Sequence, residues 1–238
     1  MVREIVAQYL PLSTARSWYG QTLQLILDFD SFVDNKINSP GVKYEVLLMF
    51  IIGAAGSLGL YWLSLEVLAV SRLEEMNFVA IARTVRPTAI IFLLWALYTV
   101  FFYFVSGHFG GYGHPRRLVK GIAWAFIPFM IANLARSAAV WWTYQDFPID
   151  DELQGFAPAE QFQNLINVGL EDPAMMFGSA VVILCTLWSA WLMIYVLQHA
   201  RGLSRQTAMR IVAVPYLIHV ALIAWYTWQG QGHGALLF

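Results

Sequence analysis

Charged residues are scarce in this sequence of 238 residues. Asp, Glu, Lys and Arg together make up 12% of the chain, whereas hydrophobic residues make up 59%. Because a soluble domain carries roughly 25% charged residues, this composition predicts an integral membrane protein. The net charge of −1 also lacks the basic excess that nucleic-acid-binding proteins use against phosphates, so no nucleic acid is expected as a partner.

Cysteine is nearly absent, because Cys185 is the only one in the chain. A single cysteine can form neither an intramolecular disulfide nor a cysteine-based metal site, and Cys185 lies in an apolar run as a small packing residue would. His108, His114 and His199 lack the spacing of a metal motif such as HExxH. We therefore expect no metal and no cofactor. The N-terminus lacks the pattern of a signal peptide, so none is expected.

Long apolar runs, in contrast, are abundant. One helix needs about 20 apolar residues to cross a bilayer, and five runs reach that length, at residues 45–70, 88–107, 118–144, 175–199 and 209–229. These runs predict an all-α, five-span membrane domain over residues 45–238. The preceding segment, residues 1–44, contains two short patterns at helical spacing, which predict N-terminal amphipathic helices. Acidic residues on the polar face of the second pattern favour packing against the protein over adhesion to anionic lipid.

The distribution of Lys and Arg predicts the orientation of the spans. Ten of them lie in the N-terminal segment and in the second-to-third and fourth-to-fifth connections, against three in the first-to-second loop and none in the external loop 145–174. Because cytoplasmic loops carry the excess of basic residues, we expect a multi-pass cell-membrane protein with a cytoplasmic N-terminus and an external C-terminus. The acidic loop 145–174 is expected to be a solvated cap, since it lacks the spacing of a calcium loop.

A glycine-rich, basic stretch joins the second and third spans and reads HFGGYGHPRRLVK from His108 to Lys120. Its bases can engage anionic headgroups at about 1 kcal/mol each or can serve only to fix the topology, and the two interpretations are compatible. No strand precedes the glycines and no Walker lysine follows them, so a nucleotide-binding loop is not expected. We predict a contact surface for lipids or partner proteins that includes His108, Gly110, Gly111, Arg116, Arg117, Lys120, Arg201 and Arg205.

Two prolines are placed alike in the third and fifth spans. Pro128 follows the first basic connection and Pro215 follows the second, so the two hairpins form a weak internal echo. Each proline is expected to bend its helix and to free a backbone carbonyl. Kinked packing alone explains them; the alternative is a small polar crevice that admits a lipid or a small solute.

Four stretches of the chain resemble the Yip domain family, which is named for eukaryotic proteins that interact with Ypt/Rab GTPases. They are Asp28-Phe-Asp-Ser-Phe-Val-Asp34, with Asp30 where the family has proline, the hairpin from Gly107 to Arg117 with Pro128, the stretch from Leu187 to Arg205, and Ala213-Val-Pro215. The resemblance covers about residues 25–228 and is strongest to prokaryotic, haloarchaeal members. It implies a five-span fold with a cytoplasmic N-terminus. Eukaryotic members are linked to vesicle trafficking, membrane shaping and GTPase recruitment.

Four polar residues lie at membrane depth: Glu66, Asn133, Arg136 and His219. Arg136 costs roughly 2.5–3.5 kcal/mol on insertion scales, and it either pairs with Glu66 or each side chain snorkels separately to the outer interface. His219 is expected to be a hydrogen-bonded packing histidine, because a proton relay needs a second ionisable partner. None of these residues forms a paired catalytic set, so we expect no enzymatic activity.

These observations lead to two functional hypotheses. The first is a non-enzymatic scaffold that organises membrane lipids, other membrane proteins or further copies of itself through the basic hairpin. The alternative is a small transporter or lipid-handling protein that uses the proline-kinked interior. Gly53, Gly56 and Gly59 form a smooth face on the first span, which lets another helix approach closely, within the chain or in a larger complex.

Overall fold

A computed structural model describes residues 28–38, 41–71, 74–145 and 172–228, without the side chains of residues 63–84 and 226–228. The predicted amphipathic helix near the N-terminus and the acidic loop 145–174, apart from its ends, lie outside the described residues. The helices are α3 (Phe29–Asn38), α4 (Lys43–Ser71), α5 (Glu74–His108), α6 (Pro115–Ala125), α7 (Ile127–Tyr144), α10 (Pro173–Arg201) and α11 (Arg205–Trp228). No strand occurs in these ranges, so the all-α prediction is confirmed.

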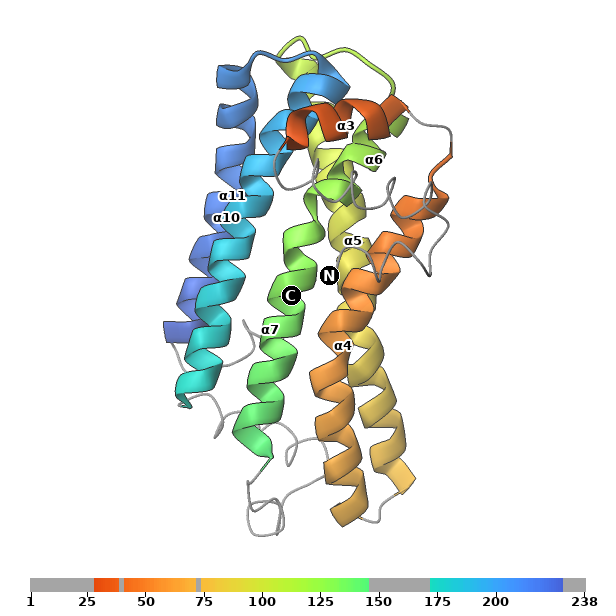
Figure 1. The fold of residues 1–238 in the computed structure, drawn as a ribbon, viewed down its shortest axis with the longest axis vertical. Coiled ribbons are helices and arrows are strands. Elements are labelled where there is room, and N and C mark those ends of the chain that lie inside the picture. Colours follow the sequence, from red (N-terminus) through yellow and green to blue (C-terminus); the bar gives the residue numbers. More distant parts are fainter. Residues whose placement is uncertain (1–27, 39–40, 72–73, 146–171, 229–238) are drawn as a thin grey trace, which may run out of the picture.

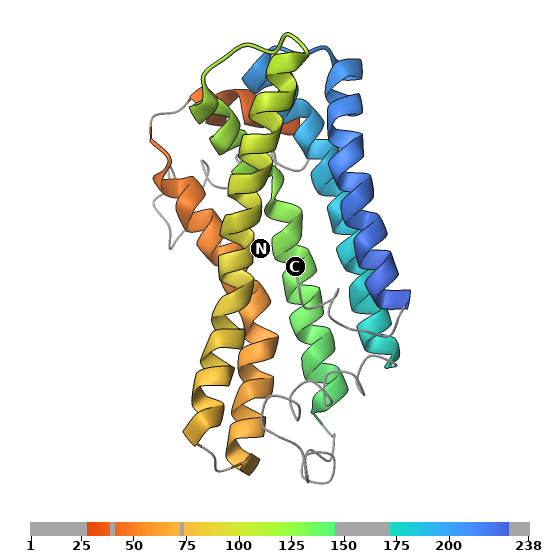
Figure 2. The ribbon, with the colours of Figure 1, turned by 180° about the vertical axis from the view of Figure 1, so that it is seen from behind.

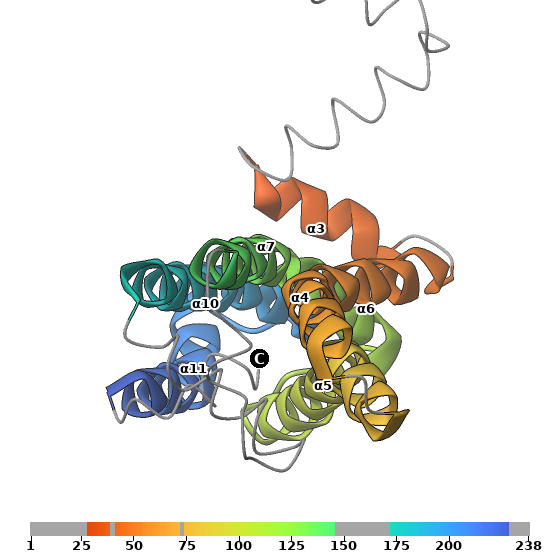
Figure 3. The ribbon, with the colours of Figure 1, turned by 90° about the horizontal axis from the view of Figure 1, so that it is seen from below.

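Five helical segments are long and apolar enough to cross a membrane, as predicted. They are α4, α5, the consecutive helices α6 and α7, α10 and α11. Each of α5, α4, α7, α10 and α11 contacts the next in that order, and the view from below shows them arranged around the bundle interior (Figure 3). The chain is therefore a multi-pass membrane protein by length and composition of its helices.

The short connections at residues 109–114 and 202–204 lie at the same end of the bundle as α3 (Figure 1). We call this the hairpin end. The last turn of α4, the first turn of α5 and the end of α7 lie at the opposite end. The N-terminal helix and both basic connections thus share one side, as the alternation of five spans requires.

The second candidate span, Val85–His108, agrees with the predicted residues 88–107, but its helix begins earlier. Helix α5 starts at Glu74 and contains Pro87 in its interior. The helix continues because Pro87 packs against α4, where a Cβ at Gly56 would lie 3.2 Å from the Pro87 side chain. Residues 74–87 are therefore helical rather than a loop, and α5 extends along α4 for most of the bundle (Figure 2).

The two predicted kink positions differ in the structure. The third span is divided at Phe126, whose φ and ψ of −86° and −3° separate α6 from α7, and Pro128 follows within the first turn of α7. Pro215 instead lies inside α11, whose helical assignment continues from Arg205 through Trp228. The helix is interrupted only at the first of these prolines.

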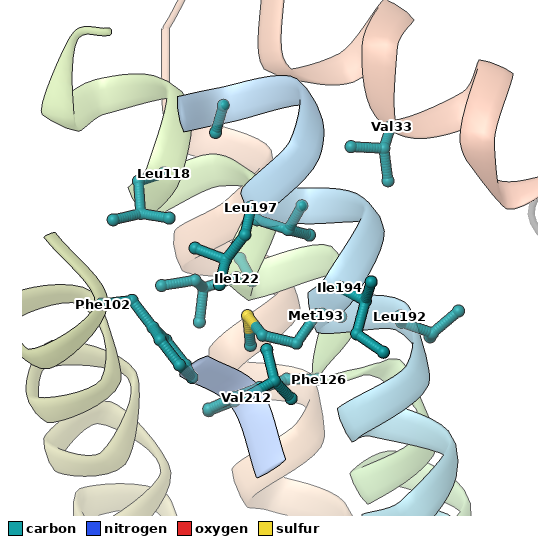
Figure 4. Packing of buried hydrophobic residues seen from close by; sticks show 14 of the residues in the cluster. Val33, Phe102, Leu118, Ile122, Phe126, Leu192, Met193, Ile194, Leu197 and Val212 are labelled. Carbon is teal, nitrogen blue, oxygen red and sulfur yellow. The ribbon is translucent and has the colours of Figure 1, made fainter. Parts of the chain in front are cut away.

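The buried apolar core lies toward the hairpin end. Phe102 of α5, Ile122 of α6, Met193 of α10 and Val212 of α11 meet there, and Val33 of α3 covers them from above (Figure 4). Helices α5, α6 and α10 end or begin at the hairpin end, with His108, Arg116 and Arg201 in their terminal turns. The core therefore holds these helix ends in fixed positions relative to one another.

Candidate functional site

Arg201, at the last turn of α10, holds the two connections of the hairpin end together. Its side chain is buried, with 4% of its surface exposed. Nε donates to Ser106 Oγ at 2.8 Å, Nη1 to the Gly113 carbonyl at 2.7 Å and Nη2 to the Gly111 carbonyl at 3.0 Å. The guanidinium also lies over the Tyr103 ring, 4.6 Å from its centroid. One side chain thus fixes the glycine hairpin to α5 and α10.

The glycines of the hairpin allow this close approach. Gly113 has a φ of +121°, and a Cβ there would collide with the Ala200 carbonyl. Gly202 has a φ of +65° and lies against the Tyr112 ring, while the Tyr112 amide donates to the Arg201 carbonyl at 3.0 Å. The glycine carbonyls point toward a cation, the reverse of a phosphate-binding loop, which presents N–H groups. The glycines therefore serve packing.

Two bases predicted for the contact surface are buried instead. Arg201 uses its donors within the protein, so it is not available to a headgroup. Lys120 has no exposed surface and lies close to Glu45, itself 3% exposed, whose carboxylate accepts a hydrogen bond from Trp124 Nε1 at 3.1 Å. A long side chain near the start of a helix can point into the protein or toward solvent. The Lys120 side chain points into the protein, where α3, α4 and α6 pack together. Lys120 thus belongs to the junction of the helices.

The bases that remain exposed gather around the start of α6. Arg116 and Arg117 occupy its first turn, and the His114 ring caps the helix by accepting from the Arg116 amide at 3.2 Å. Phe109 and Tyr112, on the preceding turn, are 54% and 74% exposed. Cations in the first turn of a helix are unfavourably placed with respect to its dipole. Helix stability therefore does not explain Arg116 and Arg117, whereas an anion at this N-terminus would.

We define the hairpin-end surface as the exposed basic and aromatic residues between positions 108 and 117, together with Arg205. It comprises His108, Phe109, Tyr112, His114, Arg116, Arg117 and Arg205. The Arg205 guanidinium lies over the Trp191 ring of α10, 5.1 Å from its centroid, and the residue as a whole stays exposed. Of the predicted contact residues, Gly110 is exposed at φ +79°, and Gly111 supplies the carbonyl bound by Arg201.

Helix α3 lies across the hairpin end and packs on the protein, not on lipid (Figure 1). Its buried face consists of Phe29, Phe32, Val33 and Ile37. Phe32 meets the Trp124 ring edge-on at 5.1 Å between centroids. Asp28 caps the helix by accepting from the Ser31 amide at 3.2 Å, and its hydrogen bonds with Ser31 lower the pKa of the Asp28 carboxyl below its usual value. An amphipathic pattern with an acidic face therefore marks a packed helix.

An acidic pair on α3 faces His199 of α10. His199 Nε2 lies 2.6 Å from Asp30 and Nδ1 lies 3.7 Å from Asp34. His199 thus contacts two carboxylates of α3. Asp30, which stands where the related motif has proline, thus makes a contact that proline could not.

We expect Asp30→Asn to loosen α3 without disturbing the bundle. The Asp30 side chain is more than half exposed, so the pair contributes on the order of 0.5–1 kcal/mol. Amide hydrogen exchange in residues 29–38 should then accelerate about two- to fivefold, while exchange in α10 stays unchanged. Asn35→Ala, at an exposed position of the same helix, is the matched control. Equal exchange rates in both variants would show that the His199 contact does not hold α3.

Two of the four polar residues at membrane depth make hydrogen bonds within the protein. Asn133 Nδ2 donates to the Ile52 carbonyl of α4 at 2.8 Å, and His219 Nδ1 lies 3.1 Å from the Tyr98 hydroxyl of α5. The His219 contact agrees with a hydrogen-bonded packing role. The Glu66 side chain lies outside the described residues, so its pairing with Arg136 stays a prediction.

Several functional contacts were not foreseen from the sequence. Ser106, Glu45 and Tyr98 each receive or make a hydrogen bond that joins two helices. The only signal available was a polar residue within an apolar run, which does not reveal its partner. Within the described ranges, no three His, Cys, Asp or Glu side chains are close enough to share a metal ion.

Comparison with known proteins gives one match. A family model described as the Yip1 domain matches residues 23–226. No curated protein and no solved structure matches the chain. The matched range includes α3, all five spans and both connections of the hairpin end.

Proposed function

Because the chain belongs to the Yip1 domain family, we propose that it is a non-enzymatic membrane scaffold that gathers anionic lipids at its hairpin-end surface. The observation that carries the proposal is the pair Arg116 and Arg117, exposed in the first turn of α6 beside the exposed rings of Phe109 and Tyr112. Aromatic rings prefer the membrane interface, and each base near an anionic surface contributes about 1 kcal/mol. Their combination suits a headgroup layer.

The rigidity of the hairpin supports a binding surface. Arg201 occupies both glycine carbonyls, and the Tyr112 amide is bonded to the end of α10. The backbone that carries Arg116 and Arg117 therefore needs little ordering when a ligand binds, and a preorganised backbone loses less conformational entropy. The fixed hairpin conformation depends on glycines and on a buried arginine. Basic residues that only set the orientation of the spans would not need that conformation.

The proposed orientation places the hairpin-end surface in the cytoplasm. Ten of the fourteen Lys and Arg residues fall in the segments on that side of the predicted topology, and the positive-inside rule assigns such a side to the cytoplasm. The cell membrane is the proposed location, with the C-terminus outside. The acidic residues between α7 and α10 support a prokaryotic, haloarchaeal source with a salty exterior.

The double variant Arg116→Gln and Arg117→Gln removes two positive charges from the hairpin-end surface. It should reduce the amount of anionic lipid that the purified protein retains. Two lost bases correspond to about 2 kcal/mol, or roughly thirtyfold weaker retention at low salt. Native mass spectrometry after reconstitution in mixed phosphatidylglycerol and phosphatidylcholine measures the effect. Thermal unfolding should not change, because both side chains are exposed.

Arg116→Lys together with Arg117→Lys is the matched control, since it keeps the charge and should retain most of the lipid. Identical lipid profiles for the glutamine variant and the wild type would refute the lipid surface. Loss of a co-purifying protein with unchanged lipids would instead identify a protein partner. No described contact favours the transporter alternative, because Asn133 and His219 use their hydrogen bonds to join helices.

A further inference from the structure

Arg136, in the middle of α7, is buried with 4% of its surface exposed. Among the residues that the structure describes, no atom accepts a hydrogen bond from either of its terminal nitrogens, Nη1 or Nη2. A buried guanidinium without an anion is strongly unfavourable, because it loses its hydration without compensation. A counter-anion would remove this cost.

A second arginine lies on a neighbouring part of the bundle. Arg86 of α5 is exposed, and α5 and α7 both pack against α4. A Cβ at Gly56 of α4 would meet both Pro87 and Asn133. Pro87 follows Arg86 directly, and Asn133 lies one helical turn before Arg136, so the two arginines lie at similar depths along the bundle. Two neighbouring cations repel each other, so an anion that bridges them removes two unfavourable terms together.

The depth of the pair indicates the kind of anion. Arg86 precedes the end of α5 by 22 residues and Arg136 follows the start of α6 by 21, so both lie about 31–33 Å from the hairpin at 1.5 Å per residue. The hydrocarbon layer is about 30 Å thick. When the hairpin lies in one headgroup layer, the arginines lie at the other. The guanidinium fork binds phosphate in a bidentate manner.

The described contacts near Arg136 supply no anion. Asn133 is committed to the Ile52 carbonyl, and a Cβ on Gly178 of α10 would meet the Ala139 methyl and, at 3.8 Å, Arg136 Cα. No carboxylate among the described side chains forms an ion pair with Arg136. Glu66 is the nearest internal candidate by sequence, and its side chain lies outside the described residues.

We propose that Arg136 and Arg86 together bind a phosphate group at the opposite end of the bundle, supplied by a phospholipid headgroup or by free phosphate. The site is separate from the hairpin-end surface and does not depend on it. Nothing in the scaffold proposal requires a specific ligand here.

Thermal unfolding of the delipidated protein in mild detergent tests the proposal. Adding phosphatidylglycerol should raise the Tm of the wild type by about 5–10 °C at saturation, whereas a galactolipid with the same acyl chains and no phosphate should not. Arg136→Gln should abolish the phosphate-specific gain, and native mass spectrometry should show at least about tenfold weaker phospholipid binding. Arg136→Lys, which keeps the charge and loses the fork, should fall between them.

Further measurements distinguish a lipid headgroup from free phosphate as the ligand, and distinguish failure of this proposal from failure of the proposed function. Inorganic phosphate at constant ionic strength should reproduce the Tm gain if free phosphate is the ligand, and should have no effect if the headgroup is. Arg86→Gln, at an exposed position, should weaken the gain even if Arg136→Gln fails to fold. The Arg116→Gln and Arg117→Gln variant should keep the gain, so failure of the hairpin proposal is recognised separately.

Two results would overturn the proposal. One is a Tm gain that is equal in the wild type and in both arginine variants, or absent in all of them. The other is a fall in the Tm of the delipidated protein on Arg136→Gln that Glu66→Gln reproduces, because Arg136 would then already have an internal counter-ion. If the site is empty in delipidated protein, Arg136→Gln instead leaves that Tm unchanged or raises it.

Discussion

Arg201→Ala is expected to release the glycine hairpin from α10 and to lower the free energy of unfolding by about 3 kcal/mol. A hydrogen bond to a charged group contributes roughly 1.5–3 kcal/mol, and Arg201 makes several of them, to Ser106, Gly111 and Gly113. Their sum is reduced because water can reach part of the hairpin once the side chain is gone. Thermal unfolding in a mild detergent measures the loss, and hydrogen exchange at residues 109–114 locates it.

Arg205→Ala is the matched control, since Arg205 lies just across the connection, at the start of α11, is exposed and stacks on the Trp191 ring. It should cost less than about 1 kcal/mol. Arg201→Lys should resemble Arg201→Ala, because an ammonium group cannot reach both glycine carbonyls and Ser106 with one planar fork. Equal stability of the Arg201 and Arg205 variants would show that the buried guanidinium does not hold the hairpin.

The fold could be predicted because run length and charge each record a simple physical requirement. A helix must be long enough to cross the hydrocarbon layer, and its backbone must satisfy its own hydrogen bonds there. The all-α, five-span prediction therefore needed no knowledge of contacts. The start of α5 was missed because Pro87 ends an isolated helical pattern, whereas packing on Gly56 lets the helix continue.

The candidate site was harder to predict, because sequence position does not determine the direction of a long side chain. Arg116, Lys120 and Arg201 all lie near helix ends, where either snorkelling or burial is possible. The core of α3, α4 and α6 takes Lys120 inward, and the hairpin carbonyls take Arg201 inward. Arg116, Arg117 and Arg205 stay exposed, which limits the arginines of the predicted surface to the starts of α6 and α11.

The glycine face of α4 was assigned correctly as a packing surface, but it is used within the chain. Cβ atoms at Gly53, Gly56 and Gly59 would meet Thr88, Asn133 and Ser137 of the two neighbouring helices. A larger complex built on this face is therefore excluded while the bundle is intact. The described lipid-facing surfaces of α4 carry large apolar residues instead, such as Leu47 and Leu58.

Gly53→Ala is expected to separate α4 from α5 and to cost about 2–3 kcal/mol. A Cβ at Gly53 would lie 2.5 Å from Thr88 Cα, and ordinary carbon contacts begin near 3.5 Å, so the helices must move apart by roughly 1 Å. Backbone atoms cannot rotate away as a side chain can. Within a membrane no hydrophobic effect compensates for the lost packing, because lipid tails are as apolar as the helix surface. Gly59→Ala should act in the same way on α7, where Ser137 Cα would be 2.7 Å away.

Gly107→Ala provides the control that isolates this effect from helix propensity. It lies in the last turn of α5, and its Cβ would meet only Arg201 Nη2, at an ordinary 3.6 Å. Since alanine is favoured over glycine in a helix by up to about 1 kcal/mol, this variant should be neutral or stabilising. Thermal unfolding of the three variants should therefore give opposite signs for identical chemical changes. If Gly53→Ala and Gly107→Ala unfolded at the same temperature, close backbone contact would not be what joins α4 to α5. The bundle would then depend on the hydrogen bonds from Asn133 and Ser137 to the α4 carbonyls.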